Sequence, residues 1–85
     1  MSCMAERDLL FGEISRERAR QDEEWGGADH VDEHEPMDWV RFIRKQCRIV
    51  ENPPESGIVG GYESRMIKIA ALALAAVESH RRRKI

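Results

Sequence analysis

The sequence lacks most features that mark a secreted, disulfide-bonded or membrane protein. Its 85 residues hold only two cysteines, Cys3 and Cys47, which lie far apart and match neither a disulfide framework nor a Cys-x-x-Cys zinc motif. The first eight residues lack the apolar core of a secretion signal, and the apolar run near the C-terminus is too short to span a bilayer. We therefore expect a cytoplasmic protein that does not contact a membrane.

The motifs of common catalytic sites are also missing. No serine lies in a Gly-x-Ser-x-Gly turn, and the chain has no P-loop for binding phosphate. The pair Gly60-Gly61 precedes a predicted helix, but this is only a weak indication of an anion site. No arrangement of a nucleophile with a general base is apparent in the sequence.

The strongest feature that is present is a helical segment predicted over Tyr62–Arg82. Residues 69–77 are nine apolar residues in succession, and five of them are alanine. A helix that is apolar all round must be buried on most sides. A chain this short buries only roughly 60% of its unfolded surface, so it needs extra burial, and oligomerisation is the source that remains. We expect this helix to mediate association into a dimer or tetramer.

Two further helices are predicted, over Ala5–Glu24 and Pro36–Val50. The first should end at the glycines that follow Trp25, and proline is favoured in the first turn of the second. Apolar residues of the second helix recur at three- and four-residue spacing. They are Val40, Ile43, Cys47 and Val50, widened by Trp39, Phe42 and Ile49. The expected fold is a single all-α domain over residues 1–85, a helical hairpin preceded by an N-terminal helix.

Charge is unevenly distributed although the net charge is only −2. Residues 1–35 hold eleven acids and four bases, whereas residues 62–85 hold two acids and six bases. Ends of opposite sign favour attraction within or between subunits. The basic run at residues 81–84 has no aromatic neighbours, so we interpret it as a solvated helix end and do not expect binding to nucleic acid.

The loop between the first two helices is the densest cluster of candidate metal ligands. His30, Asp32 and His34 are candidates for zinc or manganese, although His-x3-His spacing chelates well only on a helix. A solvated loop is the alternative. Trp25 and Trp39 flank the loop, where they either stack on a bound ring or hold the loop against the helices.

Three stretches resemble small phage and prophage proteins of the MazG-like, all-α nucleotide pyrophosphohydrolase family. They are Arg-Gln-Asp-x-x-Trp-Gly at 20–26, Asp-Trp-Val-Arg-Phe-Ile at 38–43, and the Ala-rich stretch at 66–78. The resemblance implies a helical fold and, for a phage protein, the host cytoplasm. Members of the family hydrolyse nucleoside triphosphates with Mg²⁺ held by Glu-Glu-x-x-Glu on one helix and Glu-x-x-Asp on the next.

The acids of that family are missing from this sequence. The first motif falls on Lys45, Gln46 and Ile49, and the second falls on Arg65 and Lys68. Because basic residues repel Mg²⁺, the resemblance implies the fold of the family without its metal-dependent catalysis.

The sequence therefore favours a catalytically degenerate MazG-like protein that binds a nucleotide or a similar anion. Its candidate ligand-binding residues are Lys45, Arg65, Lys68 and Trp39. In the simplest alternative, these bases pair with acids of the first helix and form a solvated face. A phage protein that binds a host protein, for example to block a defence system, is another alternative. The last is an active pyrophosphohydrolase whose Mg²⁺ or Mn²⁺ is held by the acidic loop.

Overall fold

The computed structural model describes residues 3–26, 34–58 and 60–83. Its helices are α1, Cys3–Trp25, α3, Pro36–Glu51, and α4, Gly61–Arg83. Each of the three predicted helices is confirmed, with ends within two residues of those expected. The all-α class is therefore confirmed for the part of the chain that the structure describes.

The ends of the helices have the local causes that the sequence indicates. Gly26 has a φ of 87°, and its N–H donates to the carbonyl oxygen of Asp22 at 2.9 Å, which closes α1 with a left-handed residue. Pro36 begins α3, where its missing N–H costs nothing. The backbone N–H of Glu35 donates to Oδ2 of Asp38 at 2.9 Å, so a first-turn side chain completes the cap.

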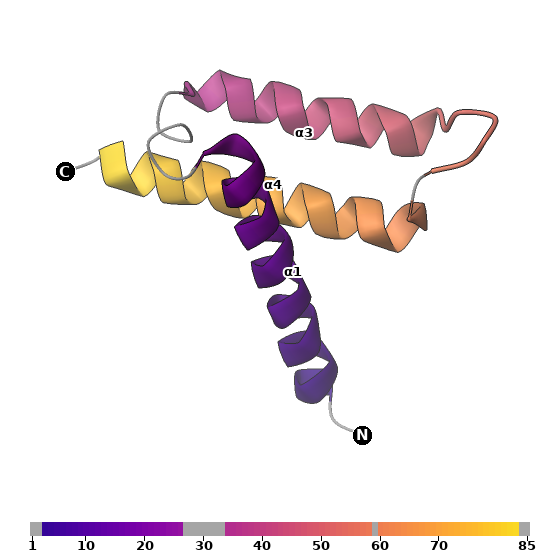
Figure 1. The fold of residues 1–85 in the computed structure, drawn as a ribbon, viewed down its shortest axis with the longest axis horizontal. Coiled ribbons are helices and arrows are strands. Elements are labelled where there is room, and N and C mark those ends of the chain that lie inside the picture. The colour runs from indigo at the N-terminus through magenta and orange to yellow at the C-terminus, as the bar shows by residue number, and fades with distance from the viewer. Residues whose placement is uncertain (1–2, 27–33, 59, 84–85) are drawn as a thin grey trace.

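Helix α4 is the centre of the fold. Both α1 and α3 pack against it, and α1 and α3 do not contact each other within the described residues. Figure 1 shows α3 and α4 running antiparallel side by side, while α1 crosses α4 and its N-terminal half projects away from both. The radius of gyration is 14.2 Å, against about 12 Å for a compact chain of this length. The fold is therefore open on one side.

The apolar core lies between α3 and α4 and is small. Trp39 and Leu72 are 2% exposed and Ala75 is fully buried, with Phe42 and Ile43 packed against them. Val40, expected on the buried face, is 39% exposed. That expectation is wrong because the large indole of Trp39 turns toward α4, which rotates the buried face of α3 away from Val40.

Helix α1 meets α4 through its polar half. Arg18 is 7% exposed and Gln21 is fully buried, whereas Leu9 and Phe11, nearer the N-terminus, are largely exposed. The packed part of α1 is thus the part that looks solvent-facing in the sequence. None of the described helices combines the length and the hydropathy that crossing a bilayer requires.

Candidate functional site

A cleft between α1 and the N-terminal half of α4 gathers the basic residues predicted on α4. We call it the α1–α4 cleft. It encloses about 200 Å³ and is lined by Glu17, Arg20, Ser64, Arg65 and Lys68. Figure 1 shows the C-terminal half of α1 crossing α4 near its middle, and the cleft lies between this part of α1 and the N-terminal half of α4.

The single carboxylate of the cleft is already engaged. Both oxygens of Glu17 accept hydrogen bonds from Arg20, at 2.8 and 2.7 Å. Arg20 also donates to Glu24 at 2.8 Å. These bonds lower the pKa of Glu17, to which the nearby charge of Lys68 also contributes, and they raise the pKa of Arg20. Glu17 is therefore a charged acceptor that orients Arg20 in the cleft.

The two basic residues of α4 are less completely paired. Arg65 donates from a terminal guanidinium nitrogen to Oε1 of Gln46 on α3, while its buried Nε has no acceptor among the described residues. Within the same part of the chain, Lys68 makes no ion pair or hydrogen bond. The cleft thus holds three cationic groups against one carboxylate.

The structure separates Lys45 from Arg65 and Lys68. Lys45 lies on the outer side of α3, in a hollow of about 850 Å³ that is also lined by Arg41, Arg44, Arg48 and Glu51. Sequence reasoning did not identify Arg20 or Ser64 as residues of the site. Glu17 and Arg20 are three residues apart, a spacing that allows an ion pair along a helix, but the sequence does not show that this pair faces α4.

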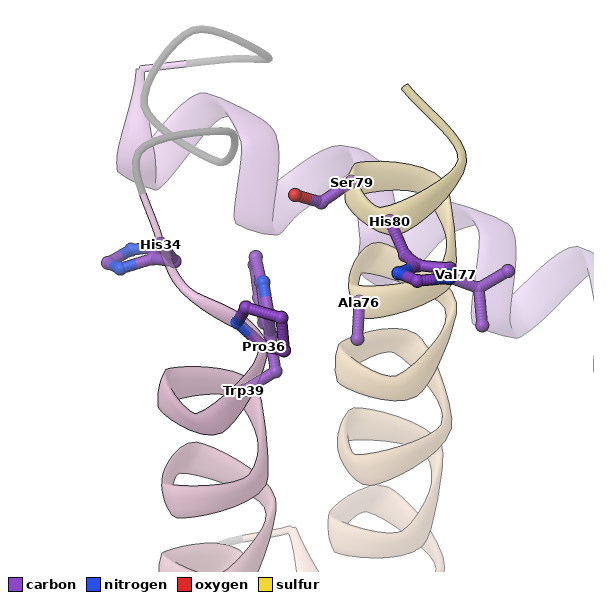
Figure 2. A pocket seen from close by; sticks show the side chains of 7 residues that line it. All are labelled: His34, Pro36, Trp39, Ala76, Val77, Ser79 and His80. Atoms are coloured by element: carbon purple, nitrogen blue, oxygen red, sulfur yellow. The ribbon is translucent and has the colours of Figure 1, made fainter. Parts of the chain in front are cut away.

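Trp39, the fourth predicted ligand-binding residue, lies at a third place. It lines an apolar pocket of about 200 Å³ between the start of α3 and the end of α4. Figure 2 shows Pro36 and Trp39 directed from α3 toward α4, with Ala76 facing them. Because the indole is almost fully buried in the core, the structure places it as a packing residue that does not reach the α1–α4 cleft.

Of the predicted metal ligands, His30 and Asp32 lie outside the described residues. The ring of His34 makes edge contacts with Trp39 and Phe42, with centroids 5.3 and 5.1 Å apart. Its Nδ1 lies 3.9 Å from Oδ2 of Asp38. Over the described ranges, no group of three or more His, Cys, Asp or Glu side chains is arranged to hold a metal ion.

We found no match to this chain among models of protein families, curated proteins or solved structures. The resemblance to the MazG-like family therefore stays a prediction.

Proposed function

We propose that this protein acts by binding a phosphate-bearing anion, a nucleotide by preference, in the α1–α4 cleft. The observation that supports this is the convergence of Arg20, Arg65 and Lys68, with the hydroxyl of Ser64, on one concave surface. Guanidinium groups donate paired hydrogen bonds to phosphate oxygens, and a lysine supplies a point charge. The cleft combines both kinds of donor.

The neighbouring surface favours a nucleotide over free phosphate. The cleft shares Glu17, Arg20 and Ser64 with an adjoining hollow of about 420 Å³ that also includes Glu13, Glu63 and one further base, Arg16. Carboxylates repel phosphate but accept hydrogen bonds from sugar hydroxyls. A nucleotide would therefore place its phosphates at the Arg65–Lys68 end and its sugar toward Glu13 and Glu63.

In the alternative, every base of the cleft pairs with an acid of α1, and only one of the three bases fits that description. Arg20 is held by Glu17 and Glu24, as that alternative requires. Lys68 has no such partner within the described residues, and the acceptor of Arg65 is a neutral amide. This remaining positive charge supports anion binding.

We propose a degenerate MazG-like protein that acts in the cytoplasm. If a phage encodes it, this is the cytoplasm of the host. Arg65 and Lys68 stand where the resemblance expects acids, and a divalent cation beside them would be repelled. Under this proposal the protein holds its ligand without cutting it. The alternative of an active hydrolase depends on the acidic loop, most of which lies outside the described residues.

The test is the thermal unfolding of the protein with phosphate, pyrophosphate, nucleoside mono- and triphosphates and cyclic dinucleotides. At ten times its Kd, a ligand stabilises the native state by about 1.4 kcal/mol, which raises the Tm of a small domain by roughly 6–11 °C. Lys68→Glu should abolish this shift. Lys45→Glu, the same charge change on the outer side of α3, should preserve it.

Two results would contradict the proposal. One is the absence of a shift with every compound in the panel. The other is a shift that Lys45→Glu removes and Lys68→Glu leaves intact, which would move the site to α3. Release of pyrophosphate from a triphosphate in the presence of Mg²⁺ or Mn²⁺, abolished by a chelator, would support the hydrolase instead.

A further inference from the structure

The N-terminal half of α1 exposes three successive large apolar side chains that are distributed around the helix, and we call this segment the apolar end of α1. Leu9 is 72% exposed, Leu10 43% and Phe11 59%. Several large apolar side chains exposed on one short segment usually mark a contact with another molecule. In Figure 1 this half of α1 projects away from α3 and α4, so neither helix covers it.

The same chain has a second uncovered apolar surface along α4, and at its C-terminal end Val77 also borders the apolar pocket beside Trp39. We call this surface the free face of α4. Its large residues are Tyr62, Met66, Leu74 and Val77, which are 63%, 41%, 41% and 47% exposed. Their spacings of four, eight and three residues place them along one side of a helix.

The chain also buries too little apolar surface for its length. Among the described residues, the buried apolar side chains are Trp39, Ala71, Leu72 and Ala75, and two of these are alanines. Chains of this size that lack disulfides or metals commonly gain burial by association. The high radius of gyration agrees with a fold that is completed by another molecule.

We infer that a second copy of this chain covers the apolar end of α1 with the free face of its own α4. A second copy fits because each chain offers both surfaces, so two reciprocal contacts close a two-fold dimer in which each surface loses exposed apolar area. Charge agrees with this pairing. Glu6, Arg7 and Asp8 precede the apolar residues of α1 with a net charge of −1, and Arg81 follows Val77 by one helical turn on the free face of α4.

The inference is independent of the anion site and is tested first by mass. Light scattering at micromolar concentration should give about twice the chain mass of 9.8 kDa. Phe11→Glu and Val77→Glu should each weaken the dimer by roughly thirtyfold or more, as expected for a buried apolar contact. Met37→Glu is the matched control, because Met37 is 61% exposed but lies on α3, outside both surfaces.

Cross-linking tests the pairing of the two surfaces without a destabilising charge. In chains with Cys3→Ser and Cys47→Ser, one chain carries Phe11→Cys and the other Val77→Cys. Mixing them under oxidation should give the mixed disulfide in preference to either like pair, and Met37→Cys should not replace Phe11→Cys. A wild-type mass of 9.8 kDa would overturn the inference. The apolar end of α1 would then bind a molecule other than a second copy. Cross-linking confined to like pairs would equally contradict it.

Discussion

Arg18 on α1 and Glu78 on α4 are joined by a hydrogen bond from Nε to Oε1 of 2.7 Å, across 60 residues of sequence. Arg18 also donates to Oδ1 of Asp22 at 2.6 Å, and its side chain is 8% exposed. A nearly buried guanidinium needs partners of opposite charge, because an unpaired one loses its hydration without compensation. This ion pair therefore helps to fix the point at which α1 crosses α4.

Removing the guanidinium of Arg18 should destabilise the fold more than expected for an arginine in a polar stretch of sequence. We expect Arg18→Met to lower the free energy of unfolding by about 2 kcal/mol, because charged hydrogen bonds at a packed contact are lost. The loss stays below that of a fully buried pair, since Asp22 and Glu78 are about 40% exposed and water can solvate them. Urea denaturation measures this change. Arg16→Met, at an exposed position of the same helix, should change stability by less than about 0.5 kcal/mol.

The side-chain amide of Gln21 is buried, and only one of its two polar atoms makes a hydrogen bond among the described residues. Its Nε2 donates to Glu17 at 3.2 Å, whereas its Oε1 has no donor among the described residues. Gln21→Met keeps the length of the side chain and removes the unpaired acceptor, so we expect a gain of about 1 kcal/mol in the free energy of unfolding. Gln46→Met is the opposing control, because the Oε1 of Gln46 accepts from Arg65 and its loss should destabilise. A decrease in stability for Gln21→Met would indicate that its amide has a partner.

The sequence predicts the helices well because their causes are local. Gly26 ends α1 through its own φ, and Pro36 and Asp38 begin α3 through the first-turn backbone. Which faces of the helices pack together depends on residues that are far apart in the sequence. Periodicity gives α3 an apolar side, but the volume of Trp39 decides how that side turns toward α4.

The candidate site could be predicted only in part for the same reason. Arg65 and Lys68 are three residues apart on one helix, so their proximity is visible in the sequence. Their separation from Lys45 and their approach to Arg20 depend on where α1 crosses α4. That crossing depends on long-range polar contacts such as Arg18–Glu78, and such contacts have no periodic pattern.

Acid should destabilise the fold through Glu17. Hydrogen bonds from Arg20 hold the pKa of Glu17 below its ordinary value of 4.5, so its charged form is favoured in the folded state. A carboxyl whose pKa is lowered by folding contributes stability above its unfolded pKa and loses it as the pH falls through the folded pKa. The free energy of unfolding should therefore decline as the pH falls below about 4.5. Urea titrations between pH 7 and pH 3 measure this decline.

Two variants separate Glu17 from the other acids. Glu17→Gln should flatten the decline, whereas Glu23→Gln, at an exposed position of the same helix, should leave it unchanged. Some decline should persist in Glu17→Gln, because the backbone N–H of Glu35 and the side chain of Arg41 also lower the pKa of Asp38 from its ordinary 3.8. An identical pH profile for Glu17→Gln and the wild type would contradict the assignment.

The small side chain of Ala75 is what allows α3 to approach α4. Ala75 is fully buried beside Trp39 and Leu72, so a larger residue has no space to occupy. We expect Ala75→Leu to lower the free energy of unfolding by roughly 1–3 kcal/mol and to shift the near-ultraviolet circular dichroism of Trp39. Ala19→Leu, at an exposed position in α1, should leave both nearly unchanged. Equal effects of the two substitutions would mean that the α3–α4 contact is loosely packed and that Ala75 does not set its spacing.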